Sequence, residues 1–353
     1  MKYGSKQISK AGNIALTSTD ENEVERAINI IDDWRTLHLI ALDELQNSIV
    51  PLLKKNNIRI FAASRRLKRI SSILNKLDRN PQSGLGTMQD IGGLRIIVPT
   101  MGNLNKAYSI ITNNVPEYFE FTKAPMNYIE KPKNISGYRS IHFIYKFHST
   151  NSDVDGMRIE LQLRTKLQHS WAMAVETAEL VTGTALKSSL GDESWITFFK
   201  IVSSLFAIKE NSPILDEHKN LNYNMKELMV KLYSLNANNH FNDTLKALRV
   251  SNTIAKQKNY KDGYYILNIN FSTQRVNIKE FPKENEEQAS ALYYRLERTA
   301  DERRNAVVLV SVPQMQQLQE AYPSYFLDTS EFFNAIDTMM RNCEKWGWAK
   351  QKT

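Results

Sequence analysis

The chain has 353 residues, of which 42% are hydrophobic, and a formal charge of +8 at neutral pH. Its length allows a buried core and favours two domains, and its single cysteine, Cys343, excludes a disulfide framework. The sequence contains neither an apolar run of about 20 residues, as a membrane helix needs, nor an apolar signal core near its start. We therefore expect a cytoplasmic protein. Its charge suits phosphate-rich partners such as nucleotides or RNA, unless it only reflects a solvated surface rich in lysine.

The N-terminal third is expected to be mainly helical. Residues 1–17 are expected to form a loose tail, and Ser18 with Glu21 fits a capping box for a long amphipathic helix. Pro51 is expected to interrupt or restart that helix. A second helix is predicted over residues 62–77, because its apolar residues recur at spacings of three and four.

Alternating and periodic apolar patterns predict the remaining elements. Two alternating segments, separated by the turn residues Asp155 and Gly156, predict a hairpin of half-buried strands. After about residue 210 a separate apolar pattern predicts a small α+β unit, preceded by helix and loop over residues 219–260. The other expected elements are strands at 94–98, 118–123, 140–147 and 157–163, helices at 103–112 and from 166, strands at 264–271, 274–281 and 306–312, and helices at 284–302 and 332–342.

Basic residues cluster on the predicted second helix. At about 100° per residue, one helix face would carry a polar set, namely Arg65, Lys68, Arg69, Ser72 and Lys76. Such a face is ordinarily just solvated. Arg66 instead falls on the apolar side, where an unpaired charge is unfavourable, so it must cap the helix start or bind a ligand.

Two carboxylates are candidate metal ligands. Asp90 precedes a predicted buried strand, and Gly92 and Gly93 allow a close approach by backbone or ligand. Glu160 shares one strand face with its polar neighbours, Gln162 and Arg164. An Asp before a strand is usually a turn residue, and a polar row is usually a solvent face. Mg²⁺, however, takes one or two carboxylates plus phosphate oxygens, and Asp90 and Glu160 would supply that pair.

A third polar cluster runs from Lys131 to His142. Its lysines and Arg139 suit phosphate binding, and Tyr138 follows a glycine at a strand start, where its ring would offer a stacking surface for a base. The alternative is a tyrosine that packs over a loop, next to ordinary polar residues of a strand face.

In their order and spacing these segments resemble the synthetase domain of RelA/SpoT proteins, over roughly residues 55–190. The matching motifs are Arg66-x-Lys68-x-x-x-Ser72-x-x-x-Lys76, Asp90-Ile91-Gly92-Gly93-Leu94-Arg95, Tyr128-Ile129 with Pro132-Lys133, Gly137-Tyr138-Arg139-Ser140-Ile141-His142, and Glu160-Leu161-Gln162-Leu163-Arg164-Thr165 with His169. The resemblance implies an α+β protein with a nucleotidyltransferase-like mixed sheet flanked by helices, plus a smaller C-terminal α+β domain. The expected division is a tail and helix at 1–50, the synthetase domain at 51–210, a helical linker at 211–260 and a C-terminal regulatory domain at 261–353.

The resemblance also implies an ATP-dependent pyrophosphokinase and a role for each matching residue. Arg66 would contact the adenine of ATP, and the other residues on the ATP side would be Lys68, Ser72, Lys76 and Arg95, of which the first three face the phosphates. Asp90 and Glu160 would be the catalytic pair and bind Mg²⁺, and Glu160 would also activate the attacking hydroxyl. Tyr138 would stack on the acceptor, and the remaining residues on the phosphate or acceptor side would be Lys133, His142, Gln162, Arg164 and His169.

Departures from the family pattern all lie on the acceptor side. The segment from Lys133 to Tyr138 is one residue longer than usual, Met126-Asn127 replaces Lys-Asp, and Ala172-Met173 replaces Ala-Glu. No His-Asp dipeptide occurs, so no alarmone hydrolase half is expected.

The acceptor therefore stays open at this point. The acceptor would be GDP or GTP, giving (p)ppGpp, which is the broader family activity. Alternatively it would be the 3′ end of tRNA, as in toxic small synthetases that a fused C-terminal segment restrains and a protein partner regulates. A third possibility is an inactive module that senses nucleotide or RNA, although retention of both Asp90 and Glu160 argues against it.

Overall fold

The computed structural model describes residues 2–68, 70–182, 193–239, 241, 242, 245, 263–270, 275–299, 305–311 and 330–350. By contact density the chain divides into two units. One comprises Met1–Ile129 and Ser140–Lys166, and the other comprises Glu130–Arg139 and Leu167–Thr353. This division does not test the expected domain boundaries at residues 51, 211 and 261, which stay predictions. Among the described residues, no helix combines the length and the apolar character needed to cross a membrane.

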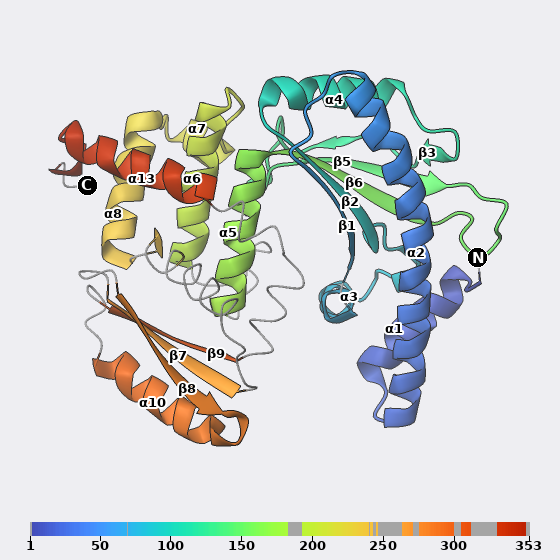
Figure 1. Ribbon diagram of the computed structural model, residues 1–353, viewed down its shortest axis with the longest axis horizontal. Helices are drawn as coiled ribbons and strands as arrows, with labels where there is room; N and C mark the ends of the chain where they lie inside the picture. The colour runs from blue at the N-terminus through green and yellow to red at the C-terminus, as the bar shows by residue number, and fades with distance from the viewer. Residues whose placement is uncertain are drawn as a thin grey trace. The chain divides into compact units, whose positions relative to one another are not determined.

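The first unit is built on a mixed β-sheet (Figure 1). Strands β2 and β6 pair in parallel, and the other neighbours pair antiparallel. A mixed sheet flanked by helices confirms the predicted fold class of this part. The strand order is β1 (Ala62–Leu67), β2 (Gly92–Val98), β6 (Arg158–Thr165), β5 (Ile141–Phe147) and β3 (Phe119–Phe121), with β4 (Met126–Asn127) also on β5.

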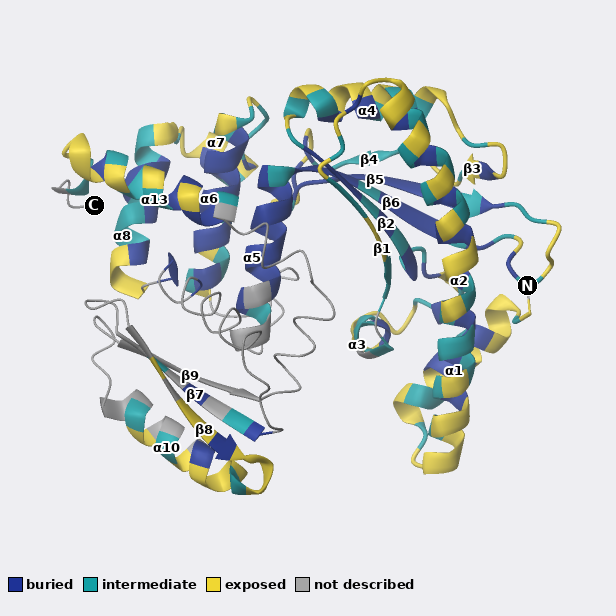
Figure 2. Cartoon of the chain, viewed as in Figure 1, coloured by how far each residue is buried: buried dark blue, intermediate teal, exposed yellow. Residues whose placement is uncertain are grey.

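Two helices, α2 (Glu21–Lys55) and α4 (Met101–Asn113), pack on the apolar face of this sheet. That face carries Leu94, Leu161 and Phe143, which join one hydrophobic core with residues of both helices. Gly92 lets α2 lie close, because a Cβ on this glycine would meet the Cβ of His38 at 3.1 Å. Figure 2 shows that β5 and β6 are buried over most of their length.

The N-terminal expectations need three corrections. Residues 1–17 are not a loose tail, because Ser5–Thr17 forms helix α1, which buries Ile8 and Ala11 in the same core as α2. Pro51 does not interrupt α2, which continues to Lys55. It removes one backbone donor near the helix end, and Ile49 and Leu53, both fully buried, hold the last turns against the core. The expected capping box of Ser18 and Glu21 does not form, because the N-cap is Asp20, whose side chain accepts from the amides of residues 22 and 23.

The predicted helix over residues 62–77 is wrong in its first half. Residues 62–67 form strand β1, which pairs antiparallel with β2, and helix α3 (Ile70–Arg79) follows and packs against α1. Pairing with a neighbouring strand overrides the local apolar spacing, which suited either element. The helical-face argument for Arg66 therefore falls, because Arg66 lies on a strand.

Elsewhere the predicted elements are largely confirmed. Strand β2, helix α4 and the hairpin of β5 and β6 form as expected, and Gly156 between the two strands has a φ of +80°. The strand predicted at 118–123 is shorter and spans Phe119–Phe121. Helix α5 (Lys166–Thr182) begins directly after β6.

The second unit contains a helical part and a three-stranded sheet. Its helices share one hydrophobic core: α5, α6 (Glu193–Lys209), α8 (Met225–Asn239) and α13 (Ser330–Lys345). The sheet has the order β8 (Arg275–Pro282), β7 (Gly263–Asn270), β9 (Asn305–Ser311) and contacts helix α10 (Glu286–Thr299), which confirms the strands and helices predicted there. The sequence did not predict α6 or the short α7 (Asp216–Asn220), and most of the loop expected before residue 260 lies outside the described residues.

Candidate active site

The strand register places polar side chains on one face of the central strands. Arg66, Gly93 and Glu160 lie opposite one another on β1, β2 and β6. Two positions along the strands, and therefore on the same face, the register aligns Ser64, Arg95, Gln162 and His142. Residues that are paired in register, or two apart in a strand, point to the same face. The sheet thus gathers predicted residues from all four strands on the face opposite the hydrophobic core.

Gly93 leaves this face open between Arg66 and Glu160. A Cβ on Gly93 would have no neighbour closer than 3.8 Å, whereas one on Gly92 would lie 2.9 Å from a side chain of the core. Packing therefore requires a glycine at position 92 but not at position 93. Gly93 therefore presents no side chain on this face between Arg66 and Glu160.

Glu160 is the centre of a buried hydrogen-bond network. Its Oε1 lies 2.7 Å from Nδ1 of His142, and its Oε2 accepts from Nε2 of Gln162 at 2.6 Å. Arg164 continues the network by donating to Oε1 of Gln162 at 2.8 Å and to Oγ of Ser140 at 3.3 Å. The predicted polar strand face is therefore not a half-exposed solvent face, since Glu160 and Arg164 are only 8% and 3% exposed.

The environment of Glu160 keeps its carboxylate ionised. Burial acts to raise the pKa of Glu160, but the charge of His142 and the hydrogen bonds from His142 and Gln162 outweigh it, so the pKa lies below its ordinary value. The nearby charge of Asp90 acts in the raising direction. The two candidate metal ligands are thus electrostatically coupled.

Two lysines hold Asp90, which lies just before β2. Nζ of Lys68 is 3.0 Å from Oδ2 of Asp90, and Nζ of Lys76 is 2.9 Å from Oδ1. Burial acts to raise the pKa of Asp90, yet the charges and hydrogen bonds of both lysines lower it below its ordinary value. Ser72 is half-buried on α3, in the sequence between these lysines. The structure therefore brings Lys68, Lys76 and Asp90 together.

The donor set fits a metal ion that substrate oxygens help to bind. In the described part of the chain, no group of three or more His, Cys, Asp and Glu side chains could hold an ion. Two ionised carboxylates, Asp90 and Glu160, match the small protein share of a Mg²⁺ site that is completed by phosphates and water. An ion at Asp90 would compete with the two lysines, because each carboxylate oxygen already has an ammonium partner.

Two residues near His142 were not predicted as site residues. The ring of Tyr128 meets that of His142 edge-on with centroids 5.2 Å apart, and its hydroxyl donates to Sδ of Met126 at 3.3 Å. Burial, and then the charge of Glu160, raises the pKa of Tyr128. Tyr128 belonged to a recognised motif and Met126 to a departure from the family pattern, so the sequence marked both positions without giving them a role.

Three predicted acceptor residues belong to the second unit. Lys133 and Tyr138 lie on the segment Glu130–Arg139, where the ammonium of Lys133 stands 5.4 Å from the centre of the Tyr138 ring. His169 is buried in α5. That these three residues join Asp90 and Glu160 in one site stays a prediction.

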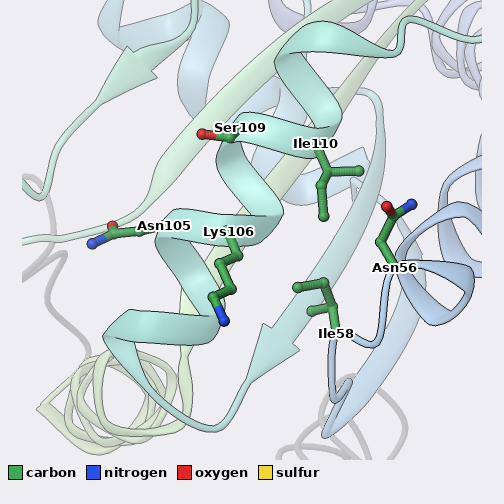
Figure 3. A pocket seen from close by; sticks show the side chains of 6 residues that line it. All are labelled: Asn56, Ile58, Asn105, Lys106, Ser109 and Ile110. Atoms are coloured by element: carbon green, nitrogen blue, oxygen red, sulfur yellow. The ribbon is translucent and has the colours of Figure 1, made fainter.

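A separate hollow lies on α4 and the end of α2 (Figure 3). It has a volume of about 450 Å³ and is lined by Asn56, Ile58, Asn105, Lys106, Ser109 and Ile110. Its single charged lining residue is Lys106, and it belongs to the helices that cover the apolar face of the sheet. It therefore contributes nothing to the cluster around Asp90 and Glu160.

Comparison with known proteins agrees with the motif pattern. Residues 65–180 match a family profile described as "Region found in RelA / SpoT proteins". Similar solved structures include small alarmone synthetase 1 from Bacillus subtilis (21% identity, 54% of this chain and 94% of that chain, TM-score 0.42) and small alarmone synthetase 2 from the same organism (20%, 54% and 97%, 0.43). A third is small alarmone synthetase 1 from B. subtilis bound to its product pppGpp (24%, 52% and 91%, 0.41). No curated protein matches the chain.

Proposed function

From the premise that the chain carries a RelA/SpoT region at residues 65–180, we propose that it is an ATP-dependent pyrophosphokinase. It transfers the β,γ-pyrophosphate of ATP to the 3′-hydroxyl of GDP or GTP and makes (p)ppGpp, acting in the cytoplasm where these nucleotides are found. The observation that carries this proposal is the pair of coupled, ionised carboxylates, Asp90 and Glu160, beside Lys68 and Lys76.

Charge neutralisation is the main requirement of phosphoryl-type transfer, and the cations supply it. Lys68 and Lys76, which pair with Asp90, would leave it for the phosphates of ATP, and Arg66 and Arg95 lie on the same sheet face as Glu160. Asp90 and Glu160 would hold Mg²⁺, which neutralises phosphate charge and orients the oxygens. Because Gly93 has no side chain, a phosphate chain would be able to pass over it between Arg66 and Glu160.

The reaction balances with Glu160 as the proton acceptor. The ribose 3′-oxygen forms a bond to the β-phosphorus of ATP, the bond from that phosphorus to the α,β-bridging oxygen breaks, and AMP leaves. The hydroxyl proton passes to Glu160, which His142 and Gln162 orient by hydrogen bonds. The lowered pKa of Glu160 keeps its carboxylate ionised before the attack, so it is free to take the proton as the hydroxyl becomes acidic.

The proposal is tested by incubating the full-length protein with Mg²⁺, γ-labelled ATP and either GDP or GTP. Label is expected on the guanine nucleotide, with release of AMP. Two variants are compared with the wild type. Glu160→Gln changes the proposed site and should lose transfer, whereas Lys106→Met changes a residue outside it and should keep transfer. Release of AMP without label on any acceptor, or equal transfer by Glu160→Gln, would contradict the proposal.

A second acceptor, the 3′ end of tRNA, is favoured by the residues around the acceptor side. Met126, which replaces the usual lysine, lies opposite His142 in the β4–β5 pair, and the segment after Lys133 is longer than usual. In this version the product blocks translation, and the C-terminal residues 261–353 restrain the enzyme and bind a protein regulator. Bulk tRNA in the same labelling assay distinguishes the two acceptors. Absence of label on guanine nucleotides and tRNA alike would leave the nucleotide- or RNA-sensing module.

A further inference from the structure

The segment that carries Lys133 and Tyr138 is closed on itself by backbone hydrogen bonds. The carbonyl of Lys133 accepts from the amide of Gly137 at 2.7 Å and from the amide of Ser136 at 3.1 Å. The amide of Lys133 donates to the carbonyl of Tyr138 at 3.3 Å. Gly137 has a φ of +83°, which favours glycine. This acceptor loop, residues 133–139, is therefore a compact turn rather than an open strand end.

Ser203 of helix α6 holds the acceptor loop at two points. Its hydroxyl donates to the carbonyl of Gly137 at 2.5 Å and accepts from Nε of Arg139 at 2.9 Å. Ser203 and Arg139 are 1% and 4% exposed, so water does not compete for these bonds. The contact is close, because a Cβ on Gly137 would lie 2.9 Å from Cβ of Ser203.

A second tether joins the loop to helix α7. The side chain of Asn134 donates to Oδ2 of Asp216 at 2.5 Å and accepts from the Asp216 amide at 2.9 Å. Helix α7 is in turn tied to α6, because Lys200 pairs with Glu217 and the hydroxyl of Ser204 accepts from the amide just before α7. Helices α6 and α7 thus form one support under the acceptor loop.

Helix α6 is itself fixed in the core of the second unit. Phe198, Phe199 and Phe206 are at most 2% exposed, and Nε1 of Trp171 donates to the carbonyl of Phe199 at 2.9 Å. Phe332 of α13 packs on Phe199 and Phe206 with ring centroids 6.3 and 5.8 Å apart. The support lies beyond residue 180, where the RelA/SpoT region ends.

We propose that Ser203 is a positioning residue for the acceptor nucleotide. It acts through Gly137 and Arg139, and keeps Lys133 and Tyr138 in the arrangement that binds the phosphate and the base of the acceptor. A loop that is ordered before binding loses less conformational freedom when the ligand arrives. The inference rests on the proposed pyrophosphokinase activity, and it assigns part of the acceptor site to a helix outside the family region.

The test compares Ser203→Ala with Ser212→Ala in the full-length protein. The hydroxyl of Ser212 donates to the carbonyl of Ala207 in the last turn of α6, so its variant controls for loss of a serine hydroxyl there. Ser203→Ala should raise the KM for the acceptor about tenfold, which corresponds to about 1.4 kcal/mol and suits the loss of a buried clamp. The KM for ATP, and kcat at saturating acceptor, should stay at the wild-type values, as should all constants of Ser212→Ala.

Hydrogen exchange gives a readout that does not need activity. Amides of residues 133–138 should exchange about tenfold faster in Ser203→Ala and at the wild-type rate in Ser212→Ala. If Ser203→Ala does not fold, Asn134→Ala serves instead, because Asn134 is exposed and its substitution removes only the second tether. This variant should show the same selective rise in the KM for the acceptor. If the KM for the acceptor is unchanged in every tether variant that folds, the inference about Ser203 is overturned. The proposed function still stands in that case, provided that the wild-type protein transfers label. A wild-type protein that labels no acceptor overturns both.

Discussion

Replacing Lys76 by methionine should strengthen metal binding and weaken ATP binding at once. Nζ of Lys76 lies 2.9 Å from Oδ1 of Asp90, with the two side chains 37% and 25% exposed. An ion that binds Oδ1 has to compete with this ammonium. At such partial exposure the pair contributes about 1 kcal/mol, so its removal should raise the affinity of the nucleotide-free protein for a divalent ion about fivefold.

The affinity for ATP should change in the opposite direction. If Lys76 moves from Asp90 to the phosphates when ATP binds, the methionine variant loses a phosphate contact, and ATP should bind about five- to tenfold more weakly. Few substitutions that merely disturb the fold would improve one affinity and weaken the other.

Manganese serves as the probe for the ion, because its spin signal reports free Mn²⁺ during a titration of nucleotide-free protein. Calorimetry of ATP binding supplies the second affinity. Lys106→Met is the matched control, since it removes the same charge from an exposed position on α4. Unchanged or weaker Mn²⁺ binding in Lys76→Met, relative to this control, would refute the displacement of Lys76 by metal.

Three further predictions concern the buried His38, the adjacent glycines at positions 92 and 93, and Glu160. Burial lowers the pKa of His38 to about 4 despite backbone hydrogen bonds, so the unfolded chain binds the proton first as the pH falls below about 6.5. This should remove about 2 kcal/mol of stability between pH 7 and pH 5. Urea unfolding at both values should show that His38→Leu lacks this loss, and an equal loss in the variant would contradict the assignment. Gly92→Ala should destabilise the protein by about 1–3 kcal/mol. Gly93→Ala should have the melting temperature of the wild type, but its kcat/KM should fall at least about tenfold, because the added methyl group lies beside Glu160. The reverse order of melting temperatures would contradict the packing argument. Glu160→Gln should lower pyrophosphate transfer by about 10²-fold or more with retained ATP binding, and wild-type rates in a labelling assay would exclude Glu160 as the base.

The parts of the fold that depend on short-range pattern were predictable. The β5–β6 hairpin follows from alternation around Asp155 and Gly156, and α5 follows β6 as expected. The polar row from Glu160 to Arg164 could be placed on one strand face for the same reason. What the pattern could not show is that this face is buried, because burial depends on which elements cover it.

The parts that depend on pairing far along the chain were not predictable. Residues 62–67 have apolar spacing that suits a helix, and only the partner strand β2 makes them a strand. The clamp on the acceptor loop was invisible for a similar reason, since Ser203 lies 64 residues after Arg139 and an isolated serine in an apolar helix carries no signal. Asp90 and its lysines stood out in the sequence as separate clusters that a resemblance connected, and their contacts came only with the structure.

The parallel pairing of β2 with β6 has a consequence for the order in which the site comes into being during synthesis. A parallel pair needs a long crossover, and here the crossover includes α4, β3, β4, the acceptor loop and β5. Asp90 and Glu160 are about 70 residues apart in the sequence, so the N-terminal helices, Lys68, Lys76 and Asp90 leave the ribosome first. A nascent or prematurely ended chain that stops before β6 has cations and one carboxylate but no second carboxylate. The two carboxylates can therefore meet only after β6, which lies just before the middle of the chain, has been made and the crossover has folded back onto β2.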